Sequence, residues 1–135
     1  MGSPISIHTD DGKRTGHVKV FKQSSGGWEL NATIHGGADL DRFGSSVALS
    51  ESGLVVAISA DRSNALATTS DIDVESIPNK SFVEVYEDYD NGTWSIVDRR
   101  LYGSDCLVDE RFHEHFGRDV SLSNDGNVLA VSRTT

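Results

Sequence analysis

The sequence predicts an all-β protein made of short antiparallel strands, and three observations support this fold class. The stretch that begins at Phe43-Gly44 returns 73 residues later at Phe116-Gly117. Apolar residues alternate with polar ones in short segments bounded by turn residues, as in β-strands. No segment repeats its apolar residues with a helical period. A duplicated unit of this length indicates a repeat architecture.

The first two predicted strands form a hairpin that covers residues 17–34. Val18 and Val20 alternate with polar residues, and the return strand carries an apolar residue at every second position. Gly26-Gly27 supplies the positive φ angles that a tight hairpin turn needs. Residues 1–16 are mostly polar and are expected to form a loop. The alternating positions of the return strand are Trp28, Leu30, Ala32 and Ile34.

The next two predicted strands lie on either side of a tight turn at residues 51–53. The strand before the turn follows the loop 35–43 and the Phe43-Gly44 pair. The strand after it is the run 55–58, which is apolar at four consecutive positions. Such a run between turns predicts a strand that is buried on both faces. The polar segment 61–80 has no clear period and is expected to be a long loop.

The pattern then restarts and predicts four more strands, which makes eight in a meander. Val83 and Val85 repeat Val18 and Val20, and Asn91-Gly92 is a strong hairpin signal. Leu101 falls one residue later than the first copy predicts, so we expect a β-bulge within residues 97–100. The loop 102–116 follows, and the second copy of the Phe-Gly motif ends the chain.

These repeated pieces resemble the FG-GAP repeats of β-propellers such as the integrin α-subunit head. Propellers consist of four-stranded antiparallel blades. The resemblance implies that residues 1–135 are a partial propeller of about two blades. Gly2-Ser3-Pro4 is similar to the end of a preceding repeat. Residues 17–34 would be the outer strands of one blade, 44–101 a complete blade and 117–132 the inner strands of the next.

The resemblance also implies a non-enzymatic binding or adhesion module at the cell surface or outside the cell, with a protein or glycan as ligand. We expect the incomplete blades to pair with remaining blades or to self-associate, because open sheet edges invite pairing. The calcium loop of the family is not carried over, since the hairpins at 51–53 and 124–126 are too short for it. The alternatives are a propeller hydrolase or lyase that uses clustered acidic residues, and a purely structural repeat.

Composition restricts the partners. The net charge of −9 disfavours nucleic acid, because like charges repel. Apolar runs are too short to insert into a membrane, and the N-terminus lacks the features of a signal peptide. The single cysteine excludes an intrachain disulfide, and the sequence indicates no cofactor.

The three long loops are the expected binding region, because alternation in a meander places them all at one edge of the sheets. Polar residues in these loops are the candidate ligand-binding residues, although loop capping and surface pairing remain open for the first three. They are Asp39, Asp41, Arg42, Asp71, Asp73, Glu75, Asp109, Arg111, His113 and His115.

Two groups within this set raise the question of a metal. Asp71, Asp73 and Glu75 alternate and could hold Ca²⁺, but a solvated acidic loop has the same pattern. His113 and His115 could ligate Zn²⁺, but a third ligand is not evident. Separately, three Asn-x-Ser/Thr sequons predict N-glycosylation in an extracellular setting. Their asparagines are Asn31, Asn79 and Asn91.

Overall fold

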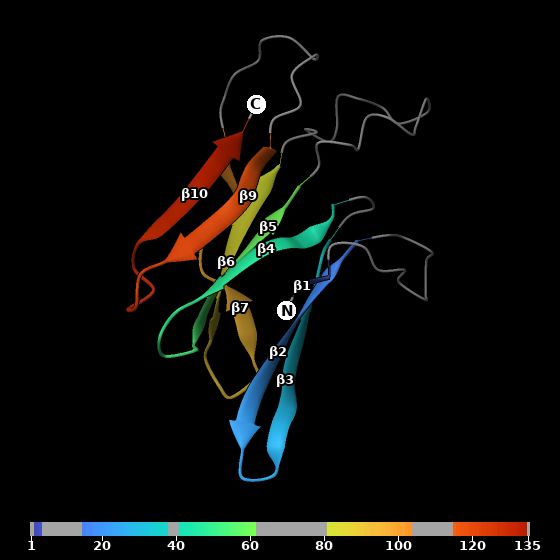
Figure 1. Ribbon diagram of the computed structural model, residues 1–135, viewed down its shortest axis with the longest axis vertical. Helices are drawn as coiled ribbons and strands as arrows, with labels where there is room; N and C mark the ends of the chain where they lie inside the picture. The colour runs from blue at the N-terminus through green and yellow to red at the C-terminus, as the bar shows by residue number, and fades with distance from the viewer. Residues whose placement is uncertain (1, 4–14, 38–40, 62–80, 104–114, 135) are drawn as a thin grey trace.

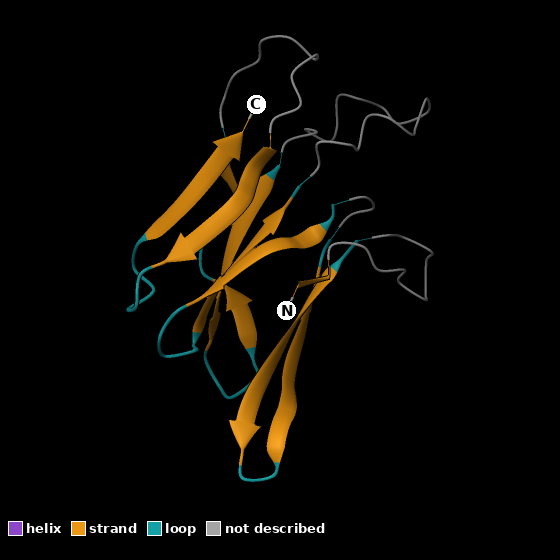
Figure 2. Ribbon diagram, viewed as in Figure 1, coloured by secondary structure: helices purple, strands orange, loops and turns teal. Residues whose placement is uncertain are grey.

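The computed structural model describes residues 2–3, 15–37, 41–61, 81–103 and 115–134, and these residues form ten strands and no helix (Figures 1 and 2). The predicted all-β class is therefore confirmed. No helix in this part of the chain is long and apolar enough to cross a membrane. The strands are β1 (Gly2–Ser3), β2 (His17–Ser24), β3 (Gly27–His35), β4 (Phe43–Leu49), β5 (Val55–Ala60), β6 (Phe82–Asp88), β7 (Trp94–Ile96), β8 (Leu101–Tyr102), β9 (His115–Leu122) and β10 (Leu129–Thr134).

The strands form three antiparallel sheets. The central sheet has the order β4-β5-β6-β7, and β8 also pairs with β6. A three-stranded sheet, β1-β2-β3, and the hairpin β9–β10 form the other two. The hairpin β9–β10 packs on β4 and β5, while β2 contacts β4 (Figure 1). The central sheet therefore has neighbours on both faces.

The core lies in two layers, one on each face of the central sheet. Val56 and Ile58 pack with Val18 and Val20 of β2. Ala57, which points the opposite way, packs with Val120 of β9. Successive strand residues face opposite sides, so residues 55–58 of β5 must all be apolar to fill both layers. The predicted strand buried on both faces is confirmed.

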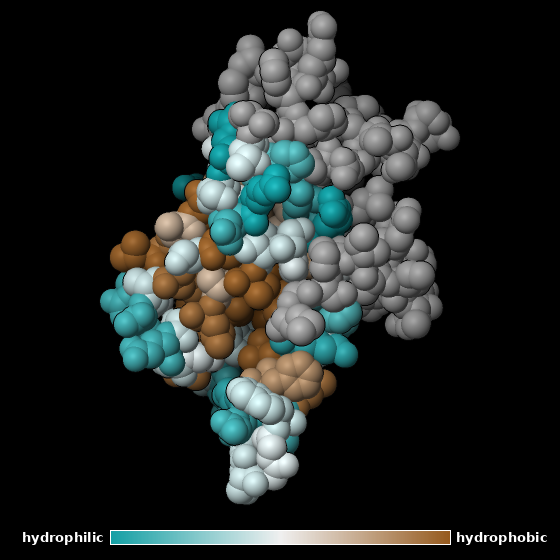
Figure 3. Space-filling view, in the orientation of Figure 1, coloured by the Kyte–Doolittle hydropathy of each residue, from teal (hydrophilic) through white to brown (hydrophobic). Residues whose placement is uncertain are grey.

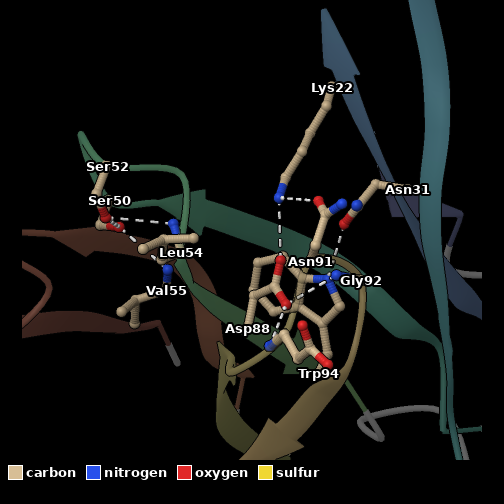
Figure 4. Close-up of polar contacts among 11 residues, drawn as sticks. Lys22, Asn31, Ser50, Ser52, Leu54, Val55, Asp88, Asn91, Gly92 and Trp94 are labelled. Carbon is tan, nitrogen blue, oxygen red and sulfur yellow. Dashed lines mark hydrogen bonds and ion pairs between the residues drawn. The ribbon is translucent and has the colours of Figure 1, made fainter.

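The repeat is visible in the hydrogen bonds of two turns. In the first, the Ser50 N–H donates to the Val55 carbonyl at 2.9 Å, and the Val55 N–H donates to the Ser50 Oγ at 3.1 Å (Figure 4). In the second, Ser123 and Val128 make the same two bonds, each at 2.9 Å. The two turns are thus copies of one structure.

A second structure that the two copies of the repeat share begins at each Phe-Gly pair. Gly44 and Gly117 have φ angles of 93° and 80°, which favour glycine, and the strand register shifts just after each pair. A serine hydroxyl bridges each shift: the Ser46 N–H donates to the Ser59 Oγ at 2.9 Å. A Cβ at Gly117 would lie 2.8 Å from the Ser59 Cβ, so this glycine permits close packing between sheets.

Two predictions about strands need correction. Gly2–Ser3 lies in the segment expected to form a loop, yet it forms β1, paired with Val18 and His17. The expected bulge at 97–100 is present, but it is larger than predicted. Val83 pairs with Leu101 and Tyr86 with Ile96, so two residues of β6 face four on the other side. The two extra residues split the predicted last strand of the sheet into β7 and β8.

The predicted unbroken alternation of Trp28, Leu30, Ala32 and Ile34 is also wrong. Val20 pairs with Ala32 while Phe21 pairs with Leu30, so Asn31 is an extra residue that breaks the alternation. Ile34 is buried, whereas Trp28 is 71% exposed and Leu30 54% exposed. These two residues lie on the outer part of the hairpin and remain largely exposed, although Trp28 borders the space between the hairpin and β4–β5.

Candidate functional site

The described ends of the three long loops meet at Asp61. Its Oδ2 lies 3.3 Å from the His115 Nδ1 and 3.9 Å from the Arg42 Nη1. Its Oδ1 accepts a hydrogen bond from the Ser81 Oγ at 3.4 Å. Arg42 ends the loop 35–43, Asp61 and Ser81 flank the loop 61–80, and His115 ends the loop 102–116. We call these four residues the Asp61 junction.

The junction connects the loops rather than forming a nucleophilic triad. In a Ser-His-Asp triad the serine bonds to the histidine and the histidine to the carboxylate. Here Ser81 and His115 both bond to Asp61. The Asp61 side chain is 17% exposed, and those of Arg42 and His115 are about one-third exposed. A partly buried carboxylate with these partners orients the loop ends and leaves one face of the junction open to solvent.

Of the ten predicted binding residues, three lie in the described part of the chain. Arg42 and His115 belong to the junction. Asp41 is fully buried, which fits loop capping better than ligand contact. Asp61 and Ser81 were not predicted, although each directly flanks a predicted loop. The remaining candidates lie outside the described residues: Asp39, Asp71, Asp73, Glu75, Asp109, Arg111 and His113.

A second polar cluster lies at the same edge of the molecule. The Arg100 Nε donates to the Glu84 Oε1 at 2.6 Å, and the Tyr86 hydroxyl donates to the Glu84 Oε2 at 2.7 Å. The Arg100 guanidinium lies 4.1 Å above the centre of the Phe82 ring, a cation–π contact. A Cβ at Gly37, in the loop 35–43, would lie 3.5 Å from the Arg100 Nη2.

The protonation states of this second cluster follow from its surroundings. Burial, together with the bond to Glu84, raises the pKa of Tyr86 well above its ordinary value of 10.0. Partial burial opposes the charge of Arg100, but the bond to Glu84 outweighs it and raises the pKa of Arg100. A neutral tyrosine and a charged arginine therefore hold a carboxylate that is itself buried, at 6% exposed.

The opposite edge carries the short turns and a hydrogen-bonded contact between sheets (Figure 4). The Lys22 Nζ donates to the Asp88 Oδ2 at 3.0 Å and to the Asn91 Oδ1 at 3.3 Å. The Trp94 Nε1 donates to the Asn31 Oδ1 at 3.2 Å. We call these five residues the hairpin clasp, because they hold β2–β3 against the turn 88–93.

Asp88 is the centre of the clasp. Its side chain is fully shielded from solvent, which by itself disfavours the charge. The N–H groups of Gly92 and Asp90 and the Lys22 ammonium outweigh that penalty and hold the pKa of Asp88 below its ordinary value of 3.8. Asp88 is therefore ionised at neutral pH and fixes the turn to the neighbouring hairpin.

Two of the three sequon asparagines belong to the clasp. Asn31 bonds to Trp94 and Asn91 to Lys22, in each case through the side-chain oxygen. A Cβ at Gly92 would lie 3.3 Å from the Asn31 Nδ2, so the nitrogen that would carry a glycan is closely packed. Asn79 lies outside the described residues. Glycosylation at these positions remains a prediction.

No group of three or more histidine, cysteine or acidic side chains within the described residues could hold a metal ion. The predicted metal candidates, Asp71, Asp73 and Glu75, lie outside these residues. His115 contacts Asp61, while His113 also falls outside.

An apolar groove of about 680 Å³ lies between the hairpin β2–β3 and the strands β4 and β5. Figure 3 shows apolar side chains gathered on the face of the molecule over this region. One wall is formed by β2 and β3, and the other by Val47, Leu49 and Val56. Leu49 is 53% exposed, which is unusual for leucine in a strand between two sheets. The lining residues are Val18, Lys19, Val20, Phe21, Trp28, Val47, Ala48, Leu49 and Val56.

Comparison with known proteins leaves the family open. No protein-family model matches the chain, and no curated protein matches it significantly. Support for a repeat architecture therefore comes from the structure: the two matching turns, the two Phe-Gly register shifts and the three sheets.

Proposed function

We propose that the chain is part of a β-propeller of the FG-GAP type. Residues 17–34 would supply the outer strands of one blade, residues 44–101 a complete blade and residues 117–132 the inner strands of the next. The proposal is supported by the internal repeat: two turns and two Phe-Gly register shifts share the same hydrogen bonds. It is further supported by the order in which the three antiparallel sheets pack face to face along the chain. Face-to-face packing of small antiparallel sheets is the arrangement that propellers repeat.

The proposed function is non-enzymatic binding of a protein or glycan by the three long loops, at the cell surface or outside the cell. The observation that carries it is the Asp61 junction, which ties together the ends of all three loops. Loops that are anchored side by side on a rigid scaffold provide a combined binding surface. The cluster of Glu84 and Arg100 extends the anchored region on the same edge.

Charge narrows the ligand class. With a net charge of −9, the chain repels polyanions through long-range electrostatics. We therefore expect neutral glycans or proteins with a basic surface rather than sulfated polysaccharides. Arg42 and His115, each about one-third exposed, are the described side chains able to donate hydrogen bonds to a ligand from the junction.

The test uses an array of immobilised neutral, sialylated and sulfated glycans, together with intact cells whose surface has been treated with protease or glycosidase. We expect the chain to bind a neutral glycan or a protease-sensitive cell-surface component. Replacement of residues 62–80 by a short Gly-Asn turn should abolish binding, and Asp61→Asn should weaken it about tenfold by releasing the loop ends. The matched control is Asp90→Asn, an exposed acid on the opposite edge.

Each result discriminates between functions. Equal binding by Asp61→Asn and Asp90→Asn would overturn the proposed binding edge. The purely structural alternative predicts no binding to the array or to cells. The hydrolase or lyase alternative needs two acids beside a histidine or arginine, and it predicts cleavage of the arrayed glycans instead of stable retention.

A further inference from the structure

Tyr102 presents an exposed aromatic ring at the edge that carries the long loops. The other exposed aromatic side chains in the described part of the chain, Phe21, Trp28 and Tyr89, lie towards the short turns. Tyr102 is 43% exposed and ends β8, where it pairs with Phe82 of β6. The two rings meet edge to face, with 6.3 Å between their centres and 63° between their planes. Tyr102 is therefore an aromatic surface held in place beside the loop ends.

The Arg100 guanidinium lies next to this ring. Arg100 and Tyr102 are two residues apart, so they share one side of the strand. The Arg100 Nε donates to Glu84, the guanidinium stacks on Phe82, and a hydrogen bond joins it to the Tyr102 hydroxyl. A guanidinium carries five N–H donors in a rigid fork, so these contacts fix the direction of its remaining Nη donors. The Arg100 side chain is 37% exposed, so part of the fork faces solvent.

The loop 35–43 places a glycine beside these donors. A Cβ at Gly37 would lie 3.5 Å from the Arg100 Nη2, which is ordinary van der Waals contact. The preceding glycine is required by the fold, because a Cβ at Gly36 would lie 2.5 Å from the Thr15 carbonyl oxygen. Gly37 has neither such a clash nor a positive φ angle. Its effect is that no side chain from this position covers Nη2.

The charges around Arg100 indicate the kind of ligand that suits it. The Glu84 carboxylate, 2.6 Å from the Arg100 Nε, balances the positive charge within the cluster. The net charge of −9 on the whole chain further opposes an anion. The remaining N–H donors therefore suit a neutral acceptor such as a hydroxyl group. A pyranose ring combines hydroxyl groups around its rim with an apolar C–H face, and that face matches the electron-rich face of an aromatic ring.

We propose that Arg100 and Tyr102 form a sugar-binding subsite, in which a neutral pyranose ring stacks on Tyr102 while its hydroxyl groups accept hydrogen bonds from the Arg100 Nη donors. The proposal deepens the proposed binding function, on which it rests, and selects a neutral glycan rather than a protein as the ligand. Phe82 and Glu84 are positioning residues, since they touch the guanidinium and not the sugar. Such a site pairs an apolar surface with a few fixed polar groups, as small-ligand sites do.

The experiment measures binding of small glycosides to the full chain by saturation-transfer difference NMR and by titration. The neutral probes are the methyl glycosides of glucose, galactose, mannose and N-acetylglucosamine. Methyl glucuronide and methyl galacturonide are the charged matches of the first two. We expect at least one neutral glycoside to bind, with the strongest saturation transfer at the C–H protons of one ring face. The charged glycosides should bind no more tightly than the neutral ones.

Substitutions separate stacking from hydrogen bonding. Tyr102→Leu keeps an apolar side chain against Phe82 but removes the aromatic face, so it should weaken binding about tenfold or more. Tyr102→Phe keeps that face and should bind within about twofold of the unmodified chain. Arg100→Lys keeps the charge beside Glu84 but loses the fork, and it should weaken binding about tenfold.

Matched controls make the same changes at exposed residues outside the subsite. Tyr89 is 63% exposed on the opposite edge, and Arg99 is the exposed neighbour of Arg100. Tyr89→Leu and Arg99→Lys should leave the affinity for the glycosides unchanged. Losses equal to those of Tyr102→Leu and Arg100→Lys would overturn the proposal.

Glu84→Gln tests the charge balance. It keeps an oxygen for the bonds from Arg100 and Tyr86 but removes the negative charge. The charged glycosides should then gain about tenfold in affinity relative to the neutral ones, because the Arg100 charge is no longer balanced. A purely structural role for Glu84 predicts no change in this ratio, and that result would overturn the assignment of a neutral ligand.

The remaining outcomes distinguish this subsite from the proposed function. The subsite is overturned if no neutral glycoside binds, or if the unmodified chain binds the charged glycosides more tightly. Retention of a protease-sensitive cell-surface protein by a chain that binds no glycoside would overturn the subsite and leave the proposed function standing. Glycoside binding that survives the replacement of residues 62–80 would support the subsite and overturn the role of that loop.

Discussion

The two copies of the Phe-Gly motif have the same local structure but different surroundings. Residues 43–59 lie between two sheets, whereas residues 116–132 pack on the central sheet through one face only. Ser59 is fully buried and Ser132 is exposed, yet both hydroxyls accept a backbone N–H across the register shift, at 2.9 and 3.0 Å.

This comparison separates what the local sequence specifies from what packing adds. The turn and the register shift form in either setting, because glycine at positive φ and a serine hydroxyl are sufficient to build them. Burial differs between the copies, so equivalent substitutions should differ in their cost by an amount that reflects packing alone.

The largest difference in unfolding free energy between the two copies is expected when their phenylalanines are replaced. Phe43 is fully buried and its ring packs edge-on against Tyr86, with 6.4 Å between ring centres. Phe43→Ala should lower the free energy of unfolding by about 3–5 kcal/mol. Phe116 is only partly buried, so Phe116→Ala should cost roughly half as much. Urea unfolding followed by tryptophan fluorescence measures both, and equal losses would contradict the packing difference.

The bridging serines should show the next largest difference. Ser59→Ala leaves the Ser46 N–H without its acceptor in a buried position, which should cost about 1–3 kcal/mol. Ser132→Ala removes the same bond at an exposed position, where water replaces the hydroxyl, so the loss should stay below about 0.5 kcal/mol. If Ser132→Ala were the more damaging change, the hydroxyl would be acting on something other than this N–H.

The turn glycines test packing between the two copies themselves. Gly53 and Gly126 have φ angles of 71° and 75°, so alanine at either position should cost about 1–2 kcal/mol of backbone strain. A Cβ at Gly53 meets nothing within 4 Å, whereas one at Gly126 would lie 2.9 Å from the Val55 Cγ2. Gly126→Ala should therefore cost about 1–2 kcal/mol more than Gly53→Ala.

Thermal unfolding of the two alanine variants, with Val55→Ala added to each, separates the strain from the clash. Removal of the Val55 side chain should bring the cost of Gly126→Ala down to that of Gly53→Ala. A difference that persists without the Val55 side chain would show that the second turn is strained for another reason.

Sequence patterns predicted the features that depend on near neighbours and missed those that depend on distant ones. The turns at Gly53 and Asn91-Gly92, the doubly buried β5 and the position of the bulge at 97–100 all follow from local spacing. The bond between Lys22 and Asp88 joins residues far apart in the chain, and neither residue carries a signal of it.

The Asp61 junction shows the same limit of prediction from sequence patterns. The sequence indicates Arg42 and His115 because they lie at the ends of long loops, and Asp61 and Ser81 have the same position in the chain. Within the segment 61–80 the alternating acids Asp71, Asp73 and Glu75 form the visible pattern, and Asp61 is not part of it. Only the strand register, which places Ala60 opposite Phe82 and Phe43, brings the loop ends together around it.

The smallest expected effect concerns one of the two positions at which the turns differ in charge, the other being Glu51, which is Asn124 in the second turn. Asp125 stands where the first turn has Ser52. Hydrogen bonds from the Ser123 hydroxyl and from the N–H and amide of Asn127 lower the pKa of Asp125 below its ordinary value of 3.8. A carboxyl with a lowered folded-state pKa stabilises the fold fully above 3.8, and this contribution is lost as the pH falls through the lowered value. Asp88 adds a contribution of the same sign in the same pH range.

Exchange of the two residues tests this assignment. Asp125→Ser should flatten the loss of stability below pH 3.8 without abolishing it, because Asp88 remains. Ser52→Asp places a carboxylate beside the Ser50 hydroxyl and the Leu54 N–H, which already bond to Ser52, so it should add an acid-sensitive contribution to the first turn. Urea midpoints measured from neutral pH to below 3.8 check both changes. If the acid limb were unaltered in both variants, the two turns would be equivalent in their electrostatics as well as in their backbone.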